Sequence, residues 1–177
     1  MKEVRLKDKS KMIFRELDLG DGEAVVNYLN KVGGETNFLT FGKEGISYTI
    51  QQEKVLLRNM KETKGNYMIG GYLKNKLVTV GSITSSSKER LKHKADIGIS
   101  VLKDYWNIGI GSQMMEYLIS LCRKNSFRKI DLIVYENNER AIKLYEKLGF
   151  VKEGLLTRDV LIDGVFYSSY HMGLKID

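Results

Sequence analysis

Apolar and polar residues alternate along short runs of the chain and recur at helical spacing along longer ones. Residues 13–17 alternate, which predicts a short strand. We expect Asp21 to cap a helix, because apolar residues then recur every three or four positions up to the glycine pair at 33–34, which ends it. Thr49 and Gln52 have the spacing of a capping box, so a second helix is predicted to begin there.

The middle of the chain is dominated by predicted strands. Two β-rich runs, 67–73 and 77–84, are separated by three polar residues and therefore predict a hairpin. A polar loop follows, and the run 96–102 predicts another strand.

The C-terminal half alternates between helices and strands. Apolar positions within 114–122 mark one face of a helix, 129–135 has the β-branched composition of a strand, and 138–148 marks another helix face. A last pair of strands, 151–162 and 165–174, is joined by an Asp-Gly turn. The pattern predicts an α/β domain of the α+β type, with a mixed, mostly antiparallel central sheet flanked by helices.

The composition suits a globular domain and excludes several classes of site. The chain has 177 residues, with 29 Lys and Arg against 22 Asp and Glu, a net charge of +7. Cys122 is the only cysteine, which excludes an internal disulfide and a cysteine-rich zinc site and predicts a cytoplasmic location. His93 and His171 are the only histidines and stand far apart, so we expect no metal centre. No apolar run approaches the roughly 18 residues of a membrane helix, so no membrane partner is expected.

The charges are unevenly distributed along the chain. Residues 16–53 hold seven acidic and two basic side chains, and the remainder is basic. The basic residues are dispersed and do not interleave with aromatic ones, so nucleic acid is not the expected partner. The net charge alone keeps a nucleic-acid-binding module as an alternative hypothesis.

The segment 106–112, Trp-Asn-Ile-Gly-Ile-Gly-Ser, lies between a predicted strand and a predicted helix. Its two glycines let the backbone approach a ligand, and the first turn of the helix presents free N–H groups and the positive end of the helix dipole, which favour a phosphate. The segment lacks the third glycine of a dinucleotide-binding fingerprint and the Gly-Lys-Ser/Thr of a P-loop. Taken alone, an ordinary glycine-rich turn explains it better.

A second motif follows at 138–150, Asn-Glu-Arg-Ala-Ile-Lys-Leu-Tyr-Glu-Lys-Leu-Gly-Phe. Together the two motifs resemble the GCN5-related N-acetyltransferase (GNAT) superfamily. Segment 106–111 corresponds to its acetyl-CoA motif Gln/Arg-x-x-Gly-x-Gly/Ala, 138–150 matches its Asn-x-x-Ala-x-x-Leu-Tyr-x-x-x-Gly-Phe signature, and 95–99 is similar to its Ala-Glu-Ile-Gly strand. The chain departs from the family at Trp106, where Gln or Arg is usual, and at Ile108, where Lys or Arg is common.

The resemblance implies a single GNAT domain over residues 1–177, with a splay between the fourth and fifth predicted strands. We expect an acceptor-side strand with two helices, antiparallel strands, an acetyl-CoA-binding core and C-terminal strands, in that order, at 12–62, 65–102, 103–150 and 151–175. The end of the chain resembles the branch that contains ribosomal-protein, amino-acid and polyamine acetyltransferases.

The resemblance also implies that acetyl-CoA is the co-substrate and which residues hold it. Pantetheine is expected to pair with the strand backbone at Ile99, Ser100 and Val101, and the Val101 N–H is the candidate that polarises the thioester carbonyl. By their charge, Arg140, Lys143 and Lys147 are candidate contacts of the CoA 3′-phosphate, although solvated helix-surface charges fit the same pattern. The other expected contacts are Asn107, Ile108, Gly109, Ile110, Gly111 and Ser112 around the pyrophosphate, with Asn138, Ala141 and Tyr145 on the following helix.

Two side chains are implied as catalytic. Tyr145 matches the family's general acid toward the departing CoA thiolate, although a tyrosine that only packs would fit the same helix face. Asp96 stands where some relatives have a glutamate base, although an outward-facing strand carboxylate would also fit. Asn138 either contacts pantetheine or caps its helix.

The expected activity is transfer of an acetyl group from acetyl-CoA to a primary amine by direct attack in a ternary complex. The acceptor is a protein N-terminus or an amino acid, with a polyamine as the alternative, and the acidic quarter at 16–53 would attract such an amine. A non-catalytic acyl-CoA-binding protein of the same fold is the rival hypothesis. A homodimer is an open option.

Overall fold

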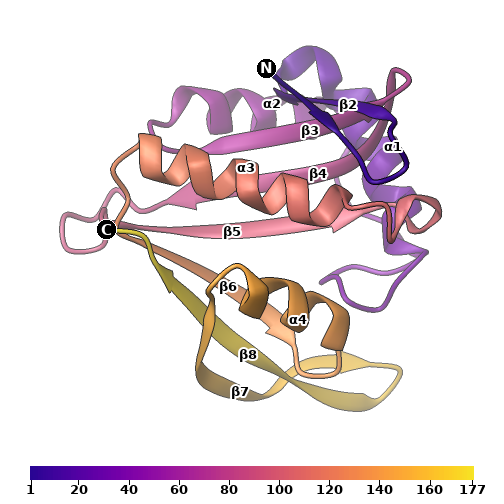
Figure 1. Cartoon of the computed structure of the whole chain (residues 1–177). Coiled ribbons are helices and arrows are strands. Elements are labelled where there is room, and N and C mark those ends of the chain that lie inside the picture. Colours follow the sequence, from indigo (N-terminus) through magenta and orange to yellow (C-terminus); the bar gives the residue numbers. More distant parts are fainter.

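The computed structural model describes all of residues 1–177 as one eight-stranded mixed sheet with four α-helices (Figure 1). The strands follow the order β1-β2-β3-β4-β5-β6-β8-β7 across the sheet. Their bounds are β1 Lys2–Arg5, β2 Lys11–Glu16, β3 Tyr67–Leu73, β4 Lys76–Ser85, β5 Lys94–Val101, β6 Lys129–Tyr135, β7 Val151–Ile162 and β8 Val165–Lys175. The helices are α1 Gly22–Gly33, α2 Ile50–Glu62, α3 Ile110–Lys124 and α4 Glu139–Lys147, with 3-10 turns at Leu19–Asp21 and Lys103–Tyr105.

The helices cover the two faces of the sheet unequally. Helices α3 and α4 lie on one face, and α1 and α2 on the other, where they stop short of β6, β7 and β8 (Figure 1). A larger apolar core fills the space beneath α3 and α4 and includes Met114, Leu118 and Phe150. A smaller one, with Tyr28 and Leu57, lies beneath α1 and α2.

Strands β5 and β6 separate after a short parallel contact. They pair only from Lys94 with Lys129 to Asp96 with Asp131, although β5 continues to Val101 and β6 to Tyr135. All other neighbouring strands pair antiparallel. The fold class and the splay predicted from the sequence are therefore confirmed, with β5 and β6 as the two strands that separate.

The start of the chain corrects two sequence-based expectations. Strand β1 was not expected, because its four residues are mostly charged, and it pairs with β2 along the edge of the sheet. The expected cap Asp21 does not cap α1 through its side chain. Instead Asp18 caps the preceding 3-10 turn, while the Asp21 carboxylate accepts hydrogen bonds of 2.6 and 2.8 Å from Arg15.

Candidate active site

A cavity of about 580 Å³ opens where β5 and β6 part. Its walls come from the end of β5, the segment before α3, the first turns of α3 and α4, and the segment after α1. Most of the residues predicted to bind acetyl-CoA line it, namely Ile99, Ser100, Val101, Asn107, Gly109, Ile110, Gly111, Ser112, Asn138, Ala141 and Tyr145. Two predicted site residues, Ile108 and Asp96, do not.

The backbone of β5 presents unpaired groups to the splay. The Leu102 N–H donates to the Val78 carbonyl on β4 at 3.0 Å. Because successive residues of a strand point their backbone groups to opposite sides, those of Ile99 and Val101 face the gap left by β6. The Val101 carbonyl accepts a 2.8 Å hydrogen bond from the Trp106 indole Nε1, so its N–H is the group left for a ligand.

The segment 106–112 curls into the cradle that its glycines predict. Asn107 and Gly109 have φ values of +68° and +96°, and Gly109 precedes the first turn of α3. The Gln113 N–H is the first to bond within the helix, to the Gly109 carbonyl at 3.1 Å, so the amides before it are available to an anion. The Ile108 side chain packs against the core, which explains its absence from the cavity wall.

Tyr145 lines the cavity from α4. The residue is 8% exposed, and its ring packs against Phe150 with centroids 5.9 Å apart. Burial raises the pKa of its hydroxyl to about 12, and no hydrogen bond within the chain engages that hydroxyl. At neutral pH the group is therefore a protonated, unoccupied donor at the cavity wall. Asn138 both lines the cavity and caps α4, since its Oδ1 accepts from the Ala141 N–H at 3.2 Å.

Asp96 lies outside this arrangement. It is the last residue of β5 that pairs with β6, and its side chain is exposed to solvent. Its position gives no geometric support to the predicted role as a base.

The acidic residues of 16–53 lie outside the cavity wall as well. None of the seven lines the cavity. Glu35, which is nearest in sequence to the cavity wall, accepts a 2.6 Å hydrogen bond from the Lys103 N–H and lies 3.7 Å from Lys31 Nζ. The acidic side chains of 16–53 are therefore not placed in the cavity wall, where they were expected to attract a cationic amine.

Sequence reasoning missed several wall residues, among them Lys7, Phe38, Leu39 and Tyr105. Phe38 and Leu39, in the segment after α1, are held at the end of β6, where the Tyr135 hydroxyl donates to the Leu39 carbonyl at 2.9 Å and the ring of Phe38 packs edge-on against Tyr135. Lys7 comes from the turn between β1 and β2, and Tyr105 from the 3-10 turn after β5. No local pattern marks any of them.

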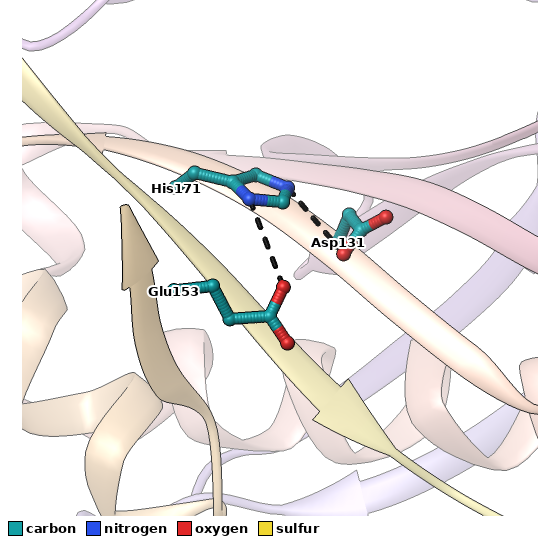
Figure 2. Close-up of side chains that lie close together, drawn as sticks. All are labelled: Asp131, Glu153 and His171. Atoms are coloured by element: carbon teal, nitrogen blue, oxygen red, sulfur yellow. Dashed lines mark ion pairs between the residues drawn. The ribbon is translucent and has the colours of Figure 1, made fainter. Parts of the chain in front are cut away.

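A second polar cluster lies away from the cavity, where Asp131, Glu153 and His171 converge from β6, β7 and β8 (Figure 2). His171 Nε2 is 3.4 Å from Asp131 Oδ1, and its Nδ1 is 3.7 Å from Glu153 Oε2. The Lys129 ammonium lies 2.9 and 2.7 Å from these same two oxygens, although it is aligned as a hydrogen bond only with Glu153. A cation of the protein thus already occupies the point where a metal would bind.

Asp131 is the buried centre of this cluster, at 1% side-chain exposure. Burial alone would raise the pKa of its carboxyl, but the hydrogen bonds and charges of Lys94 and Lys129 outweigh burial and lower that pKa below its usual value. The cluster is a charge-balanced network that joins four strands.

None of the helices combines the length and the apolar composition needed to cross a bilayer.

Cys122 is fully buried in the core beneath α3, and burial raises the pKa of its thiol to about 12, so it is an inert packing residue.

Comparison with known proteins gives one consistent result. Residues 39–150 match the acetyltransferase (GNAT) family. The chain is 36% identical over 97 residues to the L-amino acid N-acetyltransferase AaaT of Escherichia coli (strain K12), which covers 52% of this chain and 59% of that protein. The chain thus spans little more than half the length of the curated relatives it matches first.

The structural neighbours agree with the family match. An acetyltransferase of the GNAT family from Streptococcus pneumoniae has a TM-score of 0.90 and 31% identity, covering 93% of this chain and 99% of that one. A phosphinothricin acetyltransferase of the GNAT superfamily from Sinorhizobium meliloti, solved in complex with acetyl-CoA, has a TM-score of 0.80 and 12% identity, covering 93% and 88%. At that identity the second likeness shows the fold alone.

Proposed function

The chain belongs to the acetyltransferase (GNAT) family, and from this premise we propose that it transfers an acetyl group from acetyl-CoA to a primary amine by direct attack. The proposal rests on one observation, which is that two hydrogen-bond donors without partners in the chain line the same cavity. The Val101 N–H faces the splay without a strand partner, and the Tyr145 hydroxyl, unbonded within the chain, lines the same cavity.

The residues present fit acetyl-CoA. Two positive φ angles and two glycines leave a concave backbone before α3, and a Cβ added at Gly111 would point to Leu144 at 3.5 Å, within the cavity wall. The amides of 109–112 would hold the pyrophosphate, and the β5 backbone at Ile99 and Val101 would pair with pantetheine. Asn138 and Ala141 line the same wall from α4.

The proposed reaction forms a carbon–nitrogen bond and breaks a carbon–sulfur bond. A neutral amine attacks the thioester carbonyl, whose oxygen gains negative charge that the Val101 N–H stabilises. The thiolate leaves and takes the proton of the Tyr145 hydroxyl. The amine gives its extra proton to water, and water returns a proton to the Tyr145 oxygen. Asp96 does not line the cavity, so its role as a base stays a prediction.

We place the amine at the part of the cavity wall formed by the end of α1 and the segment after it, because the segment before α3 is assigned to acetyl-CoA, and this part of the wall favours an apolar amine. Val32, Phe38 and Leu39 line it, Thr36 adds a hydroxyl, and the only carboxylate among all the lining residues is Glu139 on α4, which pairs with Lys143 at 3.3 Å. A polyamine carries several positive charges whose transfer from water needs carboxylate partners. We therefore favour an acceptor that is an amino acid, or a peptide N-terminus, with an apolar side chain, over the polyamine alternative.

The test is a panel of acceptors with release of free CoA thiol as the signal. We expect turnover with leucine, methionine or phenylalanine, or with peptides that begin with them, and little with spermidine. Phe38→Ser should raise KM for the preferred acceptor, whereas Tyr48→Ser, which removes an exposed aromatic ring of the same inter-helix segment outside this cavity, should not. Preference for spermidine would favour the polyamine alternative, and binding of acetyl-CoA without turnover of any amine would favour the non-catalytic rival.

The cytoplasmic location and the homodimer stay predictions from the sequence.

A further inference from the structure

The turn between β1 and β2 docks on the segment that precedes α3. The Lys7 N–H donates to the Ile108 carbonyl at 3.2 Å. The aliphatic stem of Lys7 runs past Gly109, since a Cβ added at Gly109 would lie 3.4 to 3.8 Å from its Cγ, Cδ and Cε atoms. The side chain of Lys7 therefore emerges at the cradle from a distant part of the chain and lines the cavity.

The turn that carries Lys7 is held in place. Leu6 is only 5% exposed and belongs to the main core. The Leu6 N–H bonds the Ser10 carbonyl at 2.9 Å, and the Asp8 carboxylate accepts from the N–H and hydroxyl of Ser10 at 3.0 and 2.6 Å. Lys7 is thus positioned by a closed, anchored turn.

The charges around the cradle lack a counter-charge. Neither Lys7 nor Arg140 forms an ion pair with a carboxylate of the chain. The Arg140 guanidinium lies over the Trp106 ring at 4.7 Å and lines the same cavity. Both cations line the cavity whose wall includes the first turn of α3, so an anion bound there would meet two positive charges without partners and the positive end of the helix.

We propose that Lys7 binds the pyrophosphate of the CoA donor and thereby makes the protein select CoA thioesters over shorter pantetheine thioesters. The proposal rests on the use of acetyl-CoA as donor. The Lys7 ammonium would donate a charge-assisted hydrogen bond to a phosphate oxygen, in addition to the hydrogen bonds from the backbone N–H groups of the cradle. Those N–H groups carry only partial charges.

The test compares Lys7→Met with Lys9→Met. Lys9 lies in the same turn, is exposed and does not line the cavity, so its substitution removes the same charge without touching the proposed contact. Dissociation constants for CoA, 3′-dephospho-CoA and pantetheine are measured by calorimetry at 50 and 200 mM salt, with melting temperatures as a check of folding.

We expect Lys7→Met to weaken CoA binding about tenfold, as for one lost charge-assisted hydrogen bond, and to flatten its salt dependence. Lys9→Met should stay within about twofold of the wild type. The loss should be equal for CoA and 3′-dephospho-CoA and absent for pantetheine.

Three results would overturn the proposal. Equal CoA affinity in Lys7→Met and the wild type would make Lys7 a solvated surface charge. A loss that vanishes with 3′-dephospho-CoA would move the contact away from the pyrophosphate. Absence of CoA binding in the wild-type protein would overturn the proposed function together with this inference, whereas the first two results leave that function standing.

Discussion

The indole Nε1 of Trp106 donates a 2.8 Å hydrogen bond to the Val101 carbonyl, and this contact joins the last residue of β5 to the segment before α3. The hydrogen bond satisfies the Val101 carbonyl, which has no partner on β6. It therefore fixes the orientation of the Val101–Leu102 peptide, which is next to the peptide that carries the Val101 N–H. Trp106, which departs from the family motif, thus has a structural role in this chain. Trp106 is a positioning residue, acting through Val101.

We predict that Trp106→Phe lowers both stability and turnover. The aromatic ring remains to stack with Arg140, but the Val101 carbonyl loses its donor, which costs about 1 kcal/mol, or roughly 2–4 °C in melting temperature. Because the β5 backbone then loosens, kcat should fall several-fold while KM for the amine changes little. Tyr117→Phe, which deletes a hydroxyl remote from the cavity, serves as the control. A melting temperature that falls without any change in kcat would leave Trp106 with a purely structural role.

We predict that Gly111→Val abolishes stabilisation by acetyl-CoA. A ligand at about 100 times its dissociation constant adds roughly 2.7 kcal/mol, which is about 5–10 °C for a chain of this size. Gly111 has no positive φ, and its added Cβ would make only ordinary contact with Leu144 at 3.5 Å, so the variant should fold. Gln113→Val, two residues further along α3 and outside the cavity wall, is the matched control. A normal shift in Gly111→Val would remove the pyrophosphate cradle from the proposal.

The sequence predicted the parts of the site that lie within one continuous segment. Gly109 and Gly111 form the cradle, and Tyr145 and Asn138 share one face of α4, because helical spacing and glycine chemistry are local properties. Lys7 could not be found in this way, since its position depends on the docking of a hairpin on a segment far along the chain.

The expectations that failed did so where tertiary contacts compete with local ones. Asp21 has the composition of a helix cap, but Arg15 and Tyr72 engage its carboxylate. Glu35 belongs to an acidic segment, but its carboxylate binds the Lys103 N–H instead of facing the cavity. A count of charges along the chain does not say which of them are already paired.

Glu53 gives a prediction about pH. It is 1% exposed on α2, its Oε1 has no hydrogen-bond partner, and burial raises the pKa of its carboxyl. An acid with a raised folded-state pKa favours folding at low pH, so its contribution becomes unfavourable as pH rises from the unfolded value, about 4.3, through the folded one. Glu53→Met should therefore stabilise the protein at pH 7 by roughly 1–3 kcal/mol, and less at pH 4.

Denaturant unfolding at both pH values measures this difference. Glu62→Met, at the exposed end of the same helix, should leave the free energy of unfolding nearly unchanged. Destabilisation by Glu53→Met at pH 7 would contradict the prediction and indicate that the carboxylate contributes a favourable interaction.

The last prediction separates the two roles of Tyr145. Tyr145→Phe keeps the ring that packs on Phe150 and deletes only the proposed proton donor. General acid catalysis contributes about 10²- to 10⁴-fold, so kcat should fall by that factor, while acetyl-CoA affinity and melting temperature stay nearly constant. Because the pKa of the hydroxyl is raised to about 12, the group stays protonated through neutral pH, and wild-type kcat should show no loss from its ionisation below about pH 11.

The measurement requires saturating acceptor and a demonstration that chemistry limits the rate, because slow product release would conceal the loss. Tyr145→Ala is the companion variant. It removes the ring as well and should lower stability by about 3–5 kcal/mol, whereas Phe at this position should not. An unchanged kcat in Tyr145→Phe, together with the stability loss in Tyr145→Ala, would leave Tyr145 as a packing residue and assign protonation of the thiolate to water.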